Sequence, residues 1–216
     1  MTQDPPLRLF DLAGADEHRR FSPYCWRIRL ALAHKGLPVR TVAWRFTDKQ
    51  AIAEYLEDTY TDTPSLFGPG AGRALARFLN QWAAETLQPA IARVVVPDIP
   101  AILHAQDQDY FRSSREAAFG QSFEALAAQR PQALDNVRRL LAPLRSTLGA
   151  QPYLAGARPL YADHAVFGAF QWARMVSPVA LLEPGDPVEA WVERMLDAYG
   201  GLARGAAPAP AVGAAS

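Results

Sequence analysis

The sequence predicts an α/β front part followed by an all-helical part. Residues 7–46 show the order strand, helix, strand, which is a βαβ unit and usually builds a parallel pair of strands. A segment rich in proline and glycine comes later, and from Arg73 onward the apolar residues recur at helical spacing. We therefore expect one domain at residues 1–66 and a second, all-helical domain at 67–204. Small residues and prolines at 205–216 predict a disordered tail.

The front part is delimited by clear local signals. Leucines cluster at residues 7–12 and predict a short buried strand. In the helix that follows, Ser22 suits the N-cap, Pro23 suits the first helical position and Gly36 suits the C-terminal stop. Alternating apolar residues predict a second strand over 39–46. Because a stable sheet usually needs three strands or a packed helix, we expect the front part to be the weaker one.

Helices are expected at residues 51–60 and, after a linker at 61–72, along the rest of the chain. The apolar positions that mark three of them are Leu75, Phe78, Leu79 and Trp82; Leu134, Val137, Leu141, Leu144 and Leu148; and Val188, Trp191, Val192, Met195 and Tyr199. A further helix is expected within residues 112–128, and Pro143 should kink the helix that Pro131 opens. The strongly apolar segment 163–176 is expected to be the central helix.

Composition excludes several classes of function. Acidic and basic residues balance at 22 each, whereas a nucleic-acid binder usually shows a basic excess. The single cysteine, Cys25, excludes an internal disulfide and a cysteine-rich zinc site, and it fits a reducing, cytoplasmic location. The four histidines are scattered, so we expect no metal site. No apolar stretch is long enough to span a bilayer, and the first residues do not resemble a signal peptide.

The segment Phe21-Ser22-Pro23-Tyr24-Cys25-Trp26-Arg27 resembles the active-site turn of glutathione transferases, and most of all that of their bacterial β-etherase-like branch. Further matches follow in the same order at residues 51–57, 64–67, 109–112, 153–156 and 161–163. The resemblance covers roughly residues 7–204. It implies a truncated thioredoxin-like N-terminal domain followed by a helical C-terminal domain of the glutathione transferase type.

The resemblance also implies a reaction. Glutathione, as cosubstrate, would be conjugated to a small hydrophobic or aromatic electrophile, or would cleave an ether of such a compound. Ser22 would be the catalytic residue, because its hydroxyl and the helix dipole favour the thiolate of a thiol whose free pKa is about 8.5. Relatives of this kind are commonly homodimers, and a role in detoxification is a further expectation.

Two sets of binding residues follow from the resemblance. Ser22, Pro23, Tyr24 and Trp26 are the candidates for contact with glutathione. The candidates for an apolar substrate pocket are Trp82, Tyr110 and Phe111, although helix packing explains these three equally well. Likewise, a serine and a proline at a helix start are often only an N-cap and a first-turn residue, and a tryptophan there is often core.

One block of the family pattern has no counterpart. Relatives continue from the second strand through a second helix, a third strand entered by a cis-proline, and a fourth strand. Here residues 46–50 run directly into the next helix, and roughly thirty residues of the pattern are absent. The absent block includes the serine that holds the γ-glutamyl end of glutathione, and with it most of the family's glutathione cradle.

Two other functions stay open. A protein that lost glutathione affinity with the absent strands would be a non-catalytic scaffold or a binder of apolar ligands. A thiol exchanger would use Cys25, since Ser-Pro-Tyr-Cys resembles a Cys-x-x-Cys motif whose first cysteine is replaced. A dithiol cycle needs two cysteines, however, and Cys25 also fits a small buried core residue. Asp163 is expected to be structural, as half of a capping box in which Leu160 stands at the N-cap.

Overall fold

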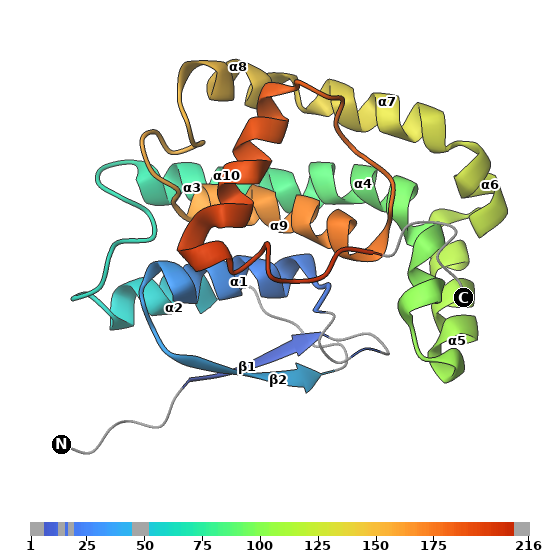
Figure 1. Cartoon of the computed structure of the whole chain (residues 1–216), viewed down its shortest axis with the longest axis horizontal. Coiled ribbons are helices and arrows are strands. Elements are labelled where there is room, and N and C mark those ends of the chain that lie inside the picture. The colour runs from blue at the N-terminus through green and yellow to red at the C-terminus, as the bar shows by residue number, and fades with distance from the viewer. Residues whose placement is uncertain (1–6, 13–15, 17–19, 45–51, 210–216) are drawn as a thin grey trace.

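The computed structural model describes residues 7–12, 16, 20–44 and 52–209. Strands β1 (Leu7–Leu12) and β2 (Val39–Trp44) pair in parallel, with Leu7 opposite Val39 and Leu12 opposite Trp44. Helix α1 (Pro23–His34) connects them, and α2 (Ile52–Thr59) lies beside α1. Figure 1 shows the sheet at one end of the molecule, α1 and α2 over it, and the helical part stacked beyond α1. The predicted βαβ unit is confirmed.

Helix α1 begins and ends where its sequence predicts. The Ser22 Oγ atom accepts a hydrogen bond from the Cys25 amide at 3.3 Å, and Pro23 occupies the first turn. The helix ends at His34 with Lys35 as its C-cap, and Gly36 follows with a φ of 65°, a left-handed conformation that favours glycine. The start of the helix is therefore held by a side-chain cap.

Beyond the linker, the described residues form helices apart from one isolated bridge between Tyr153 and Gly156. In chain order they are α3 (Gly72–Trp82), the π-helical turn η1 (Ala83–Leu87), α4 (Gln88–Val95), the 3₁₀ segment η2 (Val96–Ile102), α5 (Ala105–Phe119), α6 (Phe123–Ala128), α7 (Arg130–Leu140), α8 (Ala142–Ala150), α9 (Tyr161–Val176) and α10 (Pro187–Gly201). An α/β front part followed by a helical part is thus confirmed as the fold class.

Helix α9 is the central element, as predicted. Nearly all of its side chains are buried, and it packs against α1, α3, α4 and α10. Asp163 holds its N-terminal end: Oδ1 accepts from the Leu154 amide at 2.8 Å and from Trp191 Nε1 at 2.9 Å, and Oδ2 accepts from the Leu160 amide at 3.1 Å. Although burial raises its pKa, these three donors satisfy the Asp163 carboxylate. The structural interpretation of Asp163 is confirmed.

The core has two parts that share α1 and α9. Ile28 and Leu32 on α1 join a cluster with Leu9 of β1 and Leu56 of α2, and this cluster is completed by residues of α9 such as Ala165. Trp26 and Leu30, also on α1, belong to the larger cluster of the helical part. The small sheet therefore depends on α1 and α9 for its burial, in line with the expectation that two strands alone are marginal.

Several helix boundaries differ from the prediction. The helix expected within 112–128 is divided at Gly120, where φ is 65°. The helix opened by Pro131 is interrupted at Leu141, and Pro143 then lies in the first turn of α8. In α10 the backbone leaves the helical region at Ala198, ahead of the predicted glycine stop.

The structure corrects the expectation for the apolar positions of α3 and describes only part of the expected tail. On α3 the predicted apolar positions Leu75 and Phe78 are exposed, and Ala76 is the buried residue of that helix. Residues 205–209 of the expected tail contact α9: Ala209 donates its amide to the Arg174 carbonyl at 2.9 Å, and Arg174 Nη1 donates to the Ala206 carbonyl at 2.8 Å. Residues 210–216 lie outside the described part of the chain, so for them the tail stays a prediction.

Among the residues described, no helix is both long and apolar enough to cross a membrane. Within the same residues, no group of three or more His, Cys, Asp or Glu side chains is placed to hold a metal ion.

Candidate functional site

The candidate site is the turn into α1. Ser22 has an extended backbone conformation and is 8% exposed, and its Oγ accepts from the Cys25 amide. A serine hydroxyl that accepts one hydrogen bond still has its own proton to donate. The positive end of the helix dipole lies at the same place. The turn therefore offers a hydroxyl and a partial positive charge to an anion.

The residues around Ser22 divide into surface and core. Tyr24 is half-buried, and its ring lies over the guanidinium of Arg27, with 4.8 Å from Cζ to the ring centroid. Pro23 is buried, and a Cβ atom on Gly168 of α9 would lie 2.6 Å from its carbonyl oxygen. At this contact α9 therefore admits no side chain larger than that of glycine.

Trp26 is not placed for direct contact with glutathione. Its side chain is 0% exposed, and its Nε1 donates to the Arg20 carbonyl at 2.7 Å. The indole packs in the hydrophobic core of the helical part. This burial favours the core interpretation of Trp26, which is the commoner case for a tryptophan at such a position.

Cys25 is buried in the first turn of α1. A thiol exchanger needs an accessible sulfur, because its thiolate must reach a disulfide of another molecule. The burial of Cys25 favours the core interpretation over thiol exchange.

Arg27, which belongs to the same turn segment, is buried, although an arginine in such a helix more often lies on the solvated surface. The side chain is 2% exposed; Nη1 donates to Asn80 Oδ1 at 3.0 Å and Nη2 to Gln88 Oε1 at 3.4 Å. Desolvation lowers the pKa of this guanidinium, with opposing contributions from Tyr161 and Tyr24. These contacts join α1 to α3 and α4. No signal in the sequence marks them, because the partners lie more than fifty residues away.

The predicted substrate-pocket residues differ in burial. Tyr110 is 76% exposed on α5, whereas its neighbour Phe111 is buried and packs edge-to-face on Phe123, with 6.2 Å between ring centroids. Trp82, at the end of α3, is partly buried against the helical core. Phe111 is therefore a core residue, and helix packing accounts for it.

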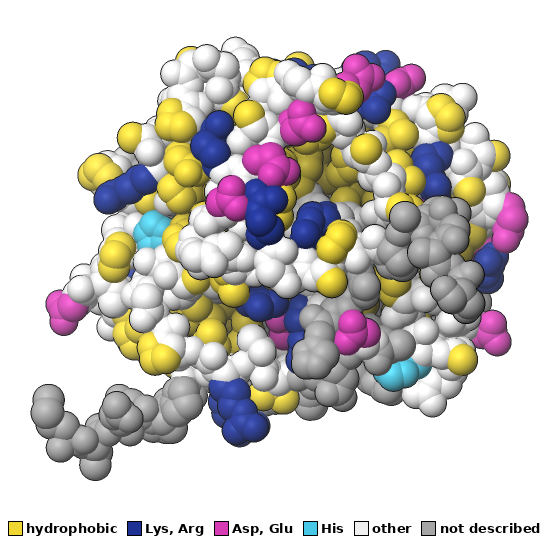
Figure 2. All heavy atoms as spheres, in the orientation of Figure 1, with side chains coloured by type: hydrophobic (Ala, Val, Ile, Leu, Met, Phe, Trp, Pro, Cys, Tyr) yellow, Lys and Arg dark blue, Asp and Glu magenta, His cyan; other side chains and the backbone are white. Residues whose placement is uncertain are grey.

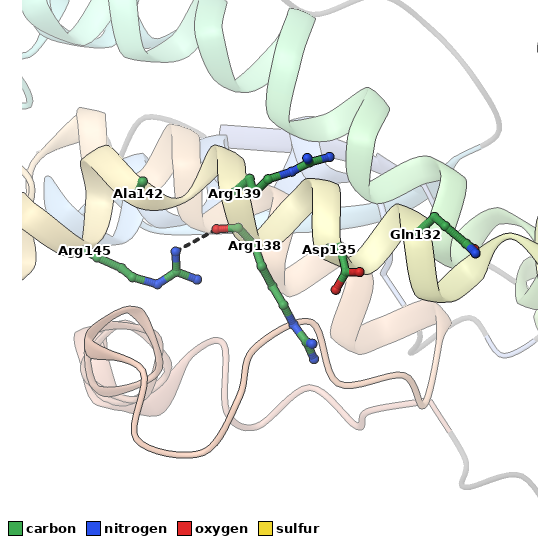
Figure 3. A pocket seen from close by; sticks show the side chains of 6 residues that line it. All are labelled: Gln132, Asp135, Arg138, Arg139, Ala142 and Arg145. Atoms are coloured by element: carbon green, nitrogen blue, oxygen red, sulfur yellow. Dashed lines mark hydrogen bonds between the residues drawn. The ribbon is translucent and has the colours of Figure 1, made fainter.

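Cavities also lie elsewhere on the described part of the chain, and two of them are larger than 400 Å³. A depression of about 730 Å³ lies along α7 and α8, where Figure 3 shows Arg138 and Arg145 on one side. Both are engaged: Arg138 pairs with Glu183 at 2.8 Å, and Arg145 with Asp186 at 2.8 Å.

The second cavity, about 470 Å³, is lined by residues of α9, residues 177–182, α10, and Pro208 and Ala209. Its lining is mainly apolar and includes Phe167, Phe170 and Val192. Figure 2 shows hydrophobic side chains in the hollow beside α10. This cavity is a candidate for an apolar ligand, and it includes neither Ser22 nor Tyr24.

Two family models match the chain. The model described as glutathione S-transferase, N-terminal domain, matches residues 21–80, which include the turn at Ser22. The model described as glutathione S-transferase, C-terminal domain, matches residues 74–195, more than half of the chain. The chain belongs to the glutathione S-transferase family. The sequence-based assignment to this superfamily, and to a glutathione transferase within it, is confirmed.

Solved structures of the family share the fold. Glutathione transferase GSTFuA3 of Phanerochaete chrysosporium superposes with a TM-score of 0.77 at 23% identity, over 89% of this chain and 96% of that one. CsGST63524 of Ceriporiopsis subvermispora, solved in complex with glutathione, gives 0.73 at 22% identity, over 91% and 98%. GSTFuA2 of P. chrysosporium gives 0.66 at 25% identity, over 92% and 94%.

Proposed function

We propose that the chain is a glutathione-dependent transferase in which Ser22 stabilises the glutathione thiolate. The observation that carries this proposal is the geometry of the turn, where the Ser22 hydroxyl caps the N-terminus of a twelve-residue helix. A hydrogen bond from the hydroxyl and the helix dipole both favour the charged form of the thiol. Membership of the family supplies the expectation that the thiol is that of glutathione.

The reaction then needs only the thiolate and an electrophile. The thiol loses its proton to solvent, and the sulfur forms a bond to carbon as a leaving group departs with the electron pair of the broken bond. With an aromatic ether, the broken bond is carbon–oxygen and the leaving group is an alkoxide or phenoxide. We assign hydrophobic or aromatic electrophiles as the substrate class, on the resemblance of the turn to the β-etherase-like branch.

We infer further that the family's block between the second strand and the third helix is truncated here. The two-stranded sheet of the described residues supports this inference. The junction itself, Lys49-Gln50-Ala51, lies outside them. A truncated cradle would leave glutathione bound mainly through the turn at Ser22, Pro23 and Tyr24, so we expect weak binding.

We also propose a homodimer formed through α2 and α3. Tyr55, Leu75 and Phe78 are large apolar side chains exposed on these two helices, and Phe78 is 67% exposed. A second copy of the chain would bury them. Phe78→Lys should then lower the mass measured by sedimentation equilibrium to that of a monomer, whereas the lysine variant of the exposed Tyr110 should not. A wild-type protein that is monomeric at every concentration tested contradicts this proposal.

An apolar-ligand binder is the alternative function, and the cavity of about 470 Å³ beside α10 is the observation that favours it. For the glutathione-dependent transferase we also propose a role in detoxification and a cytoplasmic location. The single cysteine, which is buried, supports a reducing compartment.

Calorimetric titration of reduced glutathione into the wild type and Ser22→Ala tests the main proposal. The matched control is Ser122→Ala, because the Ser122 Oγ caps α6 by accepting from the Ala125 amide at 3.2 Å, far from the turn. Binding should weaken at least tenfold in Ser22→Ala and stay unchanged in Ser122→Ala. If a folded wild type shows no binding of glutathione but binds an apolar dye that a bulky substitution at Val192 displaces, the alternative function is correct.

A further inference from the structure

Arg27 differs from the other basic side chains buried along α1. Arg29 lies 3.7 Å from Asp11, and Lys35 lies 3.0 Å from Glu57, so each has a carboxylate partner. Arg27 is more buried than Arg29, yet it contacts the two amide oxygens of Asn80 and Gln88 and the ring of Tyr24. Among the residues described, no carboxylate pairs with it.

A buried charge without a counter-ion is costly for stability, and arginine almost never lies fully buried unless it is paired. Its Nε atom is also buried without a hydrogen-bond partner in the described structure. A neutral side chain of similar volume would fill the same space at lower cost. A charge in this position can instead be compensated by an anion that is bound during function.

The position of the charge indicates where such an anion lies. The guanidinium is stacked under Tyr24, two residues after Ser22, and the Arg27 stem passes Gly168 next to the Pro23 carbonyl. The cation thus lies at the N-terminal end of α1, where the helix dipole is also positive. The guanidinium charge and the helix dipole therefore both attract an anion at Ser22. Because the guanidinium is buried, solvent screens its charge less.

We propose that Arg27 is a positioning residue for the thiolate at Ser22: its uncompensated charge favours the anion, and its stacking fixes Tyr24 beside it. The inference rests on the proposed function, since the anion is the sulfur of a thiol bound at the turn. The only bond that breaks in this step is S–H, and the proton goes to solvent. Asn80 and Gln88 hold the guanidinium in place from the helical part.

The test does not depend on glutathione binding. Ser22→Cys in a Cys25→Ala background places one thiol at the turn, and its pKa is read from the pH dependence of alkylation by iodoacetamide. We expect a pKa well below the free value of about 8.5. Adding Arg27→Gln should raise it by about one unit, a roughly tenfold loss of thiolate at lower pH, whereas Arg27→Lys should keep most of the depression.

The control is the pair Arg29→Gln with Asp11→Asn, which removes an ion pair of zero net charge between α1 and β1. It should leave the pKa of the introduced thiol unchanged. A pKa that is equal in the Arg27 and Arg27→Gln proteins, both folded by circular dichroism, overturns the inference and leaves Arg27 a packing residue. If glutathione fails to bind the wild type but the thiol pKa responds to Arg27→Gln, the electrostatic role stands and the transferase proposal falls.

Discussion

The two ends of α1 differ in how completely their polar groups are satisfied. At the C-terminal end, Lys35 Nζ lies 3.0 Å from Glu57 Oε2 and donates to the Tyr60 carbonyl at 3.1 Å. At the N-terminal end, Ser22 keeps a hydroxyl proton to donate, and Arg27 has no carboxylate partner in the described structure. The contacts at the C-terminal end join α1 to the residues that follow β2 in the chain. The hydroxyl and the guanidinium at the N-terminal end can still interact with a bound anion. Stability and function are therefore expected to separate along one helix.

A network of two histidines and one tyrosine extends the C-terminal contacts across the molecule. Tyr199 Oη lies 3.0 Å from His34 Nδ1 and 2.7 Å from His164 Nε2, and His34 Nε2 lies 3.0 Å from the Ser65 carbonyl. A carbonyl only accepts, so His34 donates to it through Nε2 and accepts the Tyr199 proton at Nδ1. His164 then donates to Tyr199 through Nε2. With both histidines neutral, this arrangement satisfies Tyr199 and both ring nitrogens of His34. On His164 it satisfies Nε2, whereas Nδ1 is buried without a hydrogen-bond partner in the described structure.

The largest effect is expected at the contact of α9 with the turn. Gly168→Ala would place a Cβ atom 2.6 Å from the Pro23 carbonyl oxygen, a backbone atom that cannot move without displacing α1. We expect a loss of about 3 kcal/mol in the free energy of unfolding, measured by urea denaturation. Gly149→Ala is the control, because no atom lies within 4 Å of a Cβ atom there. Equal stability of the two variants would show that the close approach is not a constraint.

Lys35→Met should be next in size. It removes the buried partner of Glu57, but Ser65 Oγ and the Leu66 amide still donate to that carboxylate, at 2.5 and 2.9 Å. We therefore expect a loss of about 2 kcal/mol, somewhat less than for a buried pair with no other donors. The matched control is Arg73→Met, which breaks the solvent-exposed pair with Asp58 and should change little. A Lys35→Met protein as stable as the wild type would contradict the expectation that the C-terminal contacts of α1 serve stability.

Tyr199→Phe tests the histidine network directly. The phenylalanine ring keeps the packing but removes the hydroxyl that both histidines contact, which leaves two buried ring nitrogens without a partner. We expect a loss of about 1.5 kcal/mol in the urea experiment. Tyr110→Phe changes an exposed ring and serves as the control. Should the two variants lose the same stability, the network does not stabilise the fold.

The pH dependence of stability should show the smallest effect. Burial lowers the pKa of His34 and lowers that of His164 further, with the charge of His34 as a second cause for His164. The histidines of the unfolded chain titrate near pH 6.5. Below that pH the unfolded chain therefore binds more protons than the folded protein, and stability falls with decreasing pH. The slope is at most about 1.4 kcal/mol per pH unit for each histidine. Urea midpoints at pH 7.5 and 5.5 measure it.

His164→Phe should reduce that slope, and His104→Gln, at an exposed residue, should leave it unchanged. A wild-type protein whose urea midpoint rises between pH 7.5 and 5.5 would reverse the predicted sign.

Sequence reasoning succeeded where the signal is local. The cap at Ser22, the proline in the first turn and the stop at Gly36 each act within a few residues, and the structure places all three as predicted. It failed where burial depends on distant partners. Phe78 has helical spacing but is exposed, and Arg27 is buried against partners more than fifty residues away.

By itself the sequence determined the βαβ order, the helical second half and the turn that identifies the family, because strand alternation, helix caps and motifs are short-range patterns. Only the tertiary structure decided that Arg27 is buried against Asn80 and Gln88, and that His34 meets Tyr199. The partners in the second contact are 165 residues apart. Such contacts depend on how α1, α9 and the end of α10 pack together, and no spacing within one segment encodes that packing.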